Sequence, residues 1–184
     1  MVRGKIIVVV SSDPLRPLAS AAADGDDKAF ARLVDATQGD VWRLCRLLGS
    51  PADPDDLTQD TFIRVHRSLP GFRGDTTVRA WILSIARRVC ADAVRKQLRH
   101  RRLVGRLVHM RPPDESTVMP DGSLGDLLMS VEETRREAFV LTQYIGLTYE
   151  ETAEVMGCAV GTVRSRVARA RSDLMQAWKS SSAG

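Results

Sequence analysis

The stretch from Leu147 to Leu174 constrains the fold of this chain more than any other part. Thr148 and Glu151 have the spacing of a capping box, which predicts that a helix begins there. Gly157 follows this short helix and tolerates the positive φ of a tight turn. Apolar residues then recur at three- and four-residue steps and predict a second helix with one buried face: Val160, Val163, Val167, Ala170 and Leu174. Two helices joined by a glycine turn form a helix-turn-helix, whose second helix can enter the major groove of DNA.

The opposite face of the second helix carries the residues that would meet a ligand. It contains Thr162, Arg164, Ser165, Ala168 and Arg169. Such a face is also typical of an ordinary helical hairpin whose basic side is merely solvated. The capping box, the glycine turn and Ala153, which is small enough for close helix packing, together favour DNA binding.

The distribution of charge indicates two different kinds of partner. The chain has 184 residues and a net charge of +4, with 27% charged and 43% hydrophobic residues, so it can form one large domain or two small ones. Ten basic residues lie between Arg79 and Arg111, where Asp92 is the only acid. An acidic stretch precedes them: Asp53, Asp55, Asp56 and Asp60. The basic block suits a polyanion, and the separate acidic block indicates a second partner.

No pattern in the chain predicts a metal site or a cofactor. Cys45, Cys90 and Cys158 are far apart and form no CxxC motif, which is typical of thiols in a reducing cytosol, and two of them fall on faces expected to be buried. The three histidines do not combine with them at zinc-ligand spacing. The KIIVVV run at residues 5–10 is too short to span a membrane. We therefore expect a cytoplasmic protein in which residues 1–17 form a disordered leader.

Helical periodicity predicts an all-α fold. Aromatic residues make up only 5% of the chain, and the alternation typical of strands is nearly absent. A first helix from Asp26 is separated from a second by a break at residues 38–40, with Asp40 as the N-cap. A third helix over about residues 54–69 has Asp53 as its N-cap and proline at its first position.

The next loop and helix combine the features of a site for single-stranded DNA. The loop at residues 70–77 contains Phe72 and Arg73 between glycines. The fourth helix, from about Val78, buries a face that includes Trp81 and turns a basic face outward. That basic face contains Arg87, Arg88, Arg95 and Lys96. Sites for single-stranded DNA combine cationic tracks for phosphates with pockets for unstacked bases, although a merely solvated face has the same composition.

A second helical domain follows a linker. Residues 98–122 lose the helical periodicity and contain three prolines. Ser130 and Glu133 form a capping-box pattern, which predicts that the next helix begins there. The buried face expected for that helix consists of Thr134, Ala138, Leu141 and Ile145. The chain is thus expected to form two small helical domains, residues 18–97 and 123–184, joined by a flexible linker.

Three separate motifs resemble one known family. The stretch DLTQDTFIR at residues 56–64 resembles the DLxQDxFxR signature of bacterial extracytoplasmic-function sigma factors. FRGD at 72–75 and WILSIARR at 81–88 resemble the segment that follows in that family. YEETAE at 149–154 and VGTVRSR at 160–166 resemble its C-terminal domain. The similarity keeps the order and spacing of the family over most of the chain.

This resemblance implies a dissociable, non-catalytic subunit of RNA polymerase that needs no cofactor and acts as a monomer. In the family, the N-terminal domain (region 2) docks on the clamp helices of the β′ subunit and opens the promoter −10 element. The C-terminal domain (region 4) binds the flap of the β subunit and reads the −35 element. An anti-sigma factor is a further candidate partner.

The family roles carry over to matching positions of this chain. The polymerase-facing positions are Asp56, Gln59, Asp60 and Arg64. The positions facing the −10 element are Arg73, Asp75, Thr76, Thr77, Arg79, Arg87, Arg88 and Arg95. The positions facing the −35 element are Thr162, Arg164, Ser165 and Arg169. An arginine paired bidentately with guanine contributes about 1–3 kcal/mol of discrimination between bases, which supports this division of roles.

Three other classes of protein compete with this interpretation. A conventional repressor or activator would need a dimer interface or a sensor domain, and it would leave the acidic helix and the basic loop without a role. An enzyme acting on nucleic acid would need a metal-ligand cluster or paired carboxylates, which the sequence does not offer. A pure protein-interaction module is disfavoured by the basic recognition helix.

Overall fold

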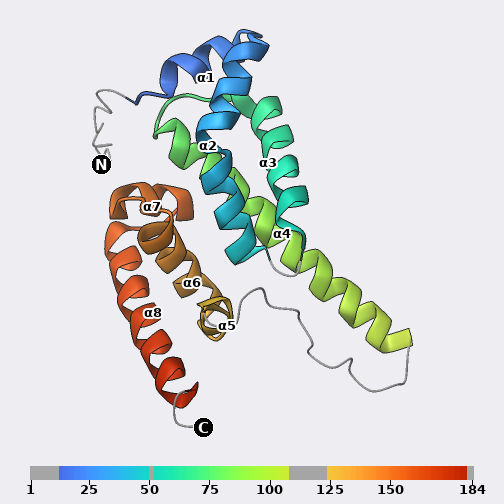
Figure 1. The fold of residues 1–184 in the computed structure, drawn as a ribbon, viewed down its shortest axis with the longest axis vertical. Helices are drawn as coiled ribbons and strands as arrows, with labels where there is room; N and C mark the ends of the chain where they lie inside the picture. The colour runs from blue at the N-terminus through green and yellow to red at the C-terminus, as the bar shows by residue number, and fades with distance from the viewer. Residues whose placement is uncertain (1–12, 50–51, 108–123, 182–184) are drawn as a thin grey trace, which may run out of the picture.

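The computed structural model describes residues 13–49, 52–107 and 124–181 (Figure 1). Every regular element in these ranges is helical, which confirms the all-α prediction. The elements are α1 (Arg16–Ala23), α2 (Asp27–Leu48), α3 (Pro54–Ser68), η1 (Leu69–Gly71), α4 (Val78–Leu107), α5 (Leu124–Met129), α6 (Glu133–Phe139), η2 (Val140–Tyr144), α7 (Tyr149–Met156) and α8 (Val160–Ser181). In the described ranges, no helix combines the length and the hydropathy needed to cross a membrane.

Helices α2, α3 and α4 pack around the core of the N-terminal domain, and α1 covers one end of α2. The largest side chains in this core are fully buried: Leu33, Val41, Leu44, Val65, Leu69, Val78, Ile82, Leu83 and Val89. The expected start of α3 is confirmed, because the Asp53 carboxylate accepts a hydrogen bond from the Asp55 N–H and proline occupies the first turn.

The expected break at residues 38–40 is wrong, because α2 continues through it. Leu33, Thr37 and Val41 are buried at four-residue steps, so the apolar face keeps one register across the predicted break. Burial of that face outweighs the cost of about 1 kcal/mol for a glycine inside a helix. Asp40 is therefore not an N-cap, and its carboxylate instead pairs with two arginines.

Two boundaries of the N-terminal domain also differ from the prediction. Residues 13–17, expected in the leader, belong to the folded domain, where Asp13 is buried and α1 begins at Arg16; residues 1–12 lie outside the described ranges. At the other end, α4 continues to Leu107 through the first ten residues of the predicted linker. Arginine, leucine, lysine and glutamine are good helix formers, so this extension needs no buried face, and periodicity could not reveal it.

The C-terminal domain begins with α5 and α6. The capping box expected at Ser130 and Glu133 is wrong, because Glu132 is the N-cap and its carboxylate accepts hydrogen bonds from the Thr134 and Arg135 N–H groups. The Ser130 hydroxyl donates instead to the Leu127 carbonyl. The predicted face of α6 and η2 is buried at Ala138, Leu141 and Ile145, whereas Thr134 is half-buried.

The helix-turn-helix forms as the sequence predicts. Thr148 and Glu151 make both hydrogen bonds of a capping box at the start of α7. Gly157 ends α7 in the left-handed region with a φ of 64°. Ala138 and Ala153 pack with Val163 and Val167 in a small core that fixes α8 against α6 and α7.

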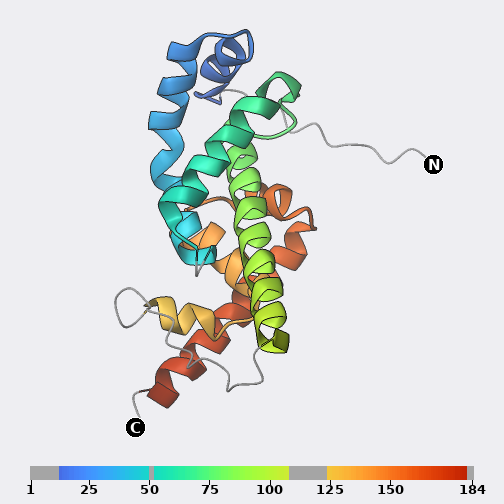
Figure 2. The same ribbon diagram turned by 90° about the vertical axis from the view of Figure 1, so that its right-hand side faces the viewer.

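The two domains pack against each other in this structure. Helix α7 lies on α4, and η2 contacts α2 (Figure 1; Figure 2 gives the view turned by 90°). The larger hydrophobic cluster contains residues of both domains, including Ile82 and Val89 from the first and Leu141, Leu147 and Val155 from the second. The predicted domains therefore share a continuous apolar core.

Candidate nucleic-acid interface

Helix α8 presents its polar face to solvent. Arg164, Ser165 and Arg169 are exposed and Thr162 is half-buried, whereas Val163 and Val167 on the other side are buried. The Arg164 guanidinium carbon lies 5.8 Å from the centre of the Tyr149 ring, within the range of a cation–π contact. This contact links the first residue of α7 to the middle of the exposed face. The face can therefore enter a groove without rearrangement of the helix-turn-helix core.

The loop at residues 72–77 joins η1 to α4, and we call it the −10 loop after the role that the family resemblance predicts for it. Phe72 packs on Trp81 with ring centres 4.9 Å apart, which anchors one end of the loop in the core. Gly74 has a φ of 73°, which few other residues adopt. Arg73 and Asp75 are exposed, and among the described residues the Thr76 hydroxyl has no hydrogen-bond partner. The loop thus presents two charged side chains on a constrained backbone.

Three of the predicted −10 residues contact the C-terminal domain. The Thr77 hydroxyl donates to the Glu151 carboxylate at 3.3 Å. Arg79 donates to the Ile145 carbonyl at 2.8 Å and also pairs with Asp40 of its own domain at 2.7 Å. We call this packing of the two domains the closed arrangement. It leaves Arg73, Asp75, Arg88 and Arg95 exposed.

The third contact is an ion pair between Arg87 and Glu137. The guanidinium Nη2 lies 2.9 Å from Oε2 of Glu137, and the arginine Nε donates to the same oxygen at 3.0 Å. The Glu137 side chain is only 6% exposed and that of Arg87 is 26% exposed. Burial raises the pKa of Glu137, and the opposing effect of Arg87 does not cancel that rise. The closed arrangement therefore encloses a carboxylate whose ion-pair partner among the described residues is Arg87.

Sequence reasoning missed Glu137, and one signal could have found it. Glu137 lies three residues after Thr134 and four before Leu141, so it is in phase with the predicted apolar face of its helix. An acid in that phase must find a buried cationic partner. The identity of that partner depends on how the two domains pack against each other, which spacing along the chain does not reveal.

The predicted polymerase-facing residues lie along α3. Asp56 and Gln59 are exposed, whereas Asp60 and Arg64 are half-buried. Arg64 bridges Asp60 at 2.9 Å and Asp92 of α4 at 3.0 Å, and Asp92 also accepts from Arg95 at 2.6 Å. Arg64 and then Arg95 hold the pKa of Asp92 below its ordinary value. The Asp92 carboxylate thus connects Arg64, a predicted polymerase-facing residue, to Arg95, a predicted −10 residue.

The cysteines behave as the sequence indicates, with Cys45 and Cys90 buried in the core of the N-terminal domain. A side-chain hydrogen bond to Cys45, together with burial, raises the pKa of Cys90. Within the part of the chain that the structure describes, no three His, Cys, Asp or Glu side chains cluster as a metal site would require.

Two family models match this chain, one on each domain. Residues 33–103 match sigma-70 region 2, and residues 121–174 match sigma-70 region 4. The first match contains α3, the −10 loop and most of α4, and the second contains the helix-turn-helix. The two surfaces described above thus fall on the two promoter-recognition regions of sigma factors.

Curated relatives show to which branch of the sigma-70 family the chain belongs. The ECF RNA polymerase sigma factor SigC of Mycobacterium tuberculosis is 42% identical over 166 residues, covering 86% of this chain and 88% of the relative. The ECF RNA polymerase sigma-E factor of Escherichia coli is 33% identical over 164 residues, covering 80% of this chain and 85% of the relative. The chain belongs to the extracytoplasmic-function branch of the sigma-70 family, as its motifs predict.

Solved structures agree with this assignment. CnrH, determined in complex with the cytosolic domain of CnrY, superposes with a TM-score of 0.71 at 30% identity, over 90% of this chain and 97% of CnrH. The sigma factor RpoE of Bartonella quintana, determined in complex with the anti-sigma factor NepR, superposes with a TM-score of 0.67 at 26% identity, over 83% of this chain and 98% of RpoE.

Proposed function

We propose that this protein binds core RNA polymerase through α3 and directs transcription from promoters that it recognises at two elements. The observation that carries the proposal is the exposed face of α8 above the buried helix-turn-helix core, in a chain whose other domain matches sigma-70 region 2. Arg164, Ser165 and Arg169 read the −35 element in the major groove, where arginine pairs bidentately with guanine. The protein itself performs no catalysis.

The −10 loop and α4 bind the melted −10 element. Arg73, Arg88 and Arg95 meet the strand first because they are exposed in the closed arrangement. Thr77, Arg79 and Arg87 join them only after the C-terminal domain has moved away, because each now contacts that domain. Asp75 and Thr76 complete the loop. Strand opening then needs only tighter binding of the melted than of the paired state.

Polymerase docking uses the exposed acidic side of α3. Asp56 and Gln59 contact the clamp helices of the β′ subunit directly, and Asp60 and Arg64 extend this surface toward α4. The C-terminal domain binds the β flap, which separates it from α4 and so exposes the −10 residues. Polymerase thus selects the open form of the protein.

We assign the domains to residues 13–107 and 124–181, each bounded by the described helices. The protein acts in the cytoplasm as a monomer until it meets polymerase. An anti-sigma factor is a further partner, by analogy with the complexes of CnrH and RpoE.

The test is reconstituted transcription with purified core polymerase, genomic promoter fragments, and the protein added or omitted. Specific start sites that require the protein are the expected result, and mapping them identifies both promoter elements. Tight binding to duplex DNA without polymerase, together with no specific transcripts, would instead indicate a conventional regulator. Each result should be repeated with the separate domains, because the closed arrangement can suppress activity in the whole chain.

A further inference from the structure

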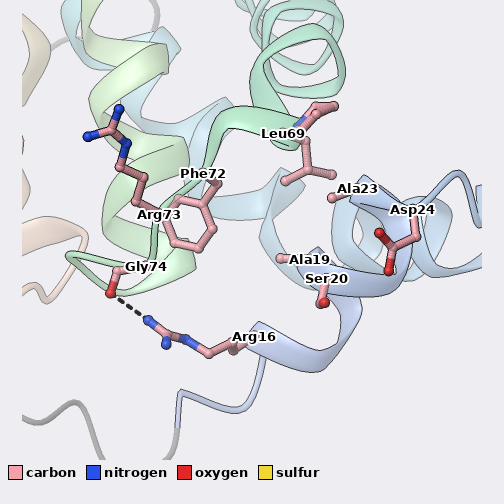
Figure 3. Close-up of a pocket in the computed structure, with 10 residues that line it drawn as sticks. Arg16, Ala19, Ser20, Ala23, Asp24, Leu69, Phe72, Arg73 and Gly74 are labelled. Carbon is pink, nitrogen blue, oxygen red and sulfur yellow. Dashed lines mark hydrogen bonds between the residues drawn. The ribbon is translucent and has the colours of Figure 1, made fainter.

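Two residues at the start of the N-terminal domain contact the −10 loop and the helix that follows it. Asp13 hydrogen-bonds to the first residue of α4, and Arg16 hydrogen-bonds to Gly74 in the middle of the loop (Figure 3). Both residues belong to the stretch that the sequence assigned to the leader. Neither lies on the basic face of α4 nor on α3, so neither belongs to the surfaces assigned above.

Asp13 anchors the point where the loop becomes a helix. Asp13 as a whole residue is 9% exposed, and its Oδ2 accepts a hydrogen bond from the Val78 N–H at 2.7 Å. Its Oδ1 accepts from the Leu15 N–H at 3.1 Å, which fixes the carboxylate itself. The first N–H groups of a helix have no partner within the helix, and a carboxylate there is favoured by the helix dipole. Asp13 therefore serves as a distant N-cap for α4.

Arg16 holds the loop across a gap. Its Nη2 donates to the Gly74 carbonyl at 2.5 Å. A cavity of about 200 Å³ separates α1 from the loop and is lined by Ala19, Ser20 and Ala23 on one side and Phe72 on the other. In Figure 3 the Arg73 side chain points away from Arg16, so the two arginines act on opposite sides of the loop. Arg16 and Gly74 both line this cavity as well.

The backbone at Gly74 leaves little freedom at this contact. Its φ is 73°, and a Cβ at this position would collide with the Arg16 guanidinium. The carbonyl that Arg16 binds thus belongs to the residue that sets the direction of the loop. Loss of Arg16 would release that carbonyl and let the loop sample other directions over the cavity.

We propose that Asp13 and Arg16 are positioning residues for the −10 loop, which hold it in one conformation and thereby set its discrimination among bases of the melted strand. This inference rests on the proposed function. Neither side chain contacts DNA in this scheme. Because the loop is already ordered before the strand arrives, binding does not lose free energy in ordering a mobile loop.

The experiment measures base preference with core polymerase, the full-length protein, and promoters in which either the −10 or the −35 element is randomised. Arg16→Ala should reduce the preference for the best −10 base by about fivefold, the usual effect of losing one hydrogen bond. The −35 preference and the midpoint of thermal unfolding should not change. Arg16→Lys should restore most of the preference, since an ammonium group can still donate to the Gly74 carbonyl. Asp13→Ala should reduce the −10 preference independently.

Arg32→Ala is the matched control, because it removes one exposed arginine from α2 of the same domain. A direct phosphate contact by Arg16 would weaken binding to all sequences equally and lower the salt dependence of binding. That result would overturn the proposal, as would an unchanged −10 preference in Arg16→Ala. A wild-type protein without any polymerase-dependent −10 preference would instead refute the proposed function, and this inference with it.

Discussion

Replacing Arg87 by methionine should open the two domains. Methionine keeps most of the length of the side chain, so the main change is the loss of the only cation that pairs with Glu137 in the described structure. The Glu137 carboxylate would then be buried without a partner in the closed arrangement, whereas separation of the domains returns it to water. Breaking one side of a buried ion pair typically costs about 3–5 kcal/mol.

The effect here should be smaller, because the Arg87 side chain is 26% exposed and water already screens the pair. We expect the closed arrangement to lose about 2 kcal/mol, which is roughly a thirtyfold shift toward the open form. Small-angle X-ray scattering of the free protein should detect this shift as a larger radius of gyration. Arg88→Met is the control, because it removes the neighbouring charge on the exposed side of α4 without touching the interface.

The raised pKa of Glu137 also predicts how the equilibrium between the closed and open forms depends on pH. Burial raises the pKa of Glu137 above its ordinary value in the closed arrangement. We expect the open form, which returns the carboxylate to water, to have the ordinary pKa, so the closed form binds the proton more tightly. The contribution of Glu137 protonation to closure is therefore fully present below the ordinary carboxyl pKa. It is lost as the pH rises through the raised pKa of the closed form. Without Arg87 the pKa should rise further and move this loss to higher pH. The reasoning would be refuted if Arg87→Met and Arg88→Met gave the same radius of gyration at every pH.

Three further predictions address the other surfaces. The double variant Asp56→Ala, Gln59→Ala should be retained on immobilised core polymerase about tenfold more weakly, with an unchanged midpoint of thermal unfolding. Full retention would contradict the assignment of α3 to polymerase docking. Arg164→Ala should lower affinity for −35 duplexes by about tenfold and leave binding to −10 single strands intact, and an equal loss on both DNAs would contradict the assignment. Gly157→Ala should destabilise the protein by about 1 kcal/mol, because Gly157 has a positive φ. Gly39→Ala should stabilise it by a similar amount, because Gly39 lies in an exposed turn of α2. Calorimetric changes of the same sign for both variants would contradict this argument from backbone conformation.

Local sequence signals predicted the elements whose causes are local. The capping box at Thr148 and the left-handed turn at Gly157 depend on residues within one turn of each other, and both are confirmed. Ser130 shows a similar pattern, but Glu132 supplies the cap instead, and the Ser130 hydroxyl donates to the Leu127 carbonyl. Local patterns therefore predict that a helix starts near a position more reliably than they predict which residue caps it.

Structural features that depend on long-range packing were harder to predict from the sequence. The break expected near Gly39 disappears because the α2 face on both sides of it is buried against α3 and α4. Asp13 was predicted to lie in a disordered leader, because its partner, the Val78 N–H, lies 65 residues away. The exposed face of α8 could be identified from spacing alone, since it needs no partner within the chain. The contact between Arg87 and Glu137 could not, because it requires two domains to meet.

Both halves of the domain interface belong to one chain, and this changes how strongly they must attract each other. Covalent connection gives each half an effective concentration near its partner that is on the order of millimolar, above that of most separate molecules in solution. An interface too weak to join two separate domains can therefore keep the intact chain closed, and dilution cannot open it. Cleavage between the domains would make closure depend on concentration. The affinity of the isolated N-terminal domain for the −10 strand will consequently exceed that of the whole protein by the reciprocal of its open fraction, because only the −10 residues are covered on closure.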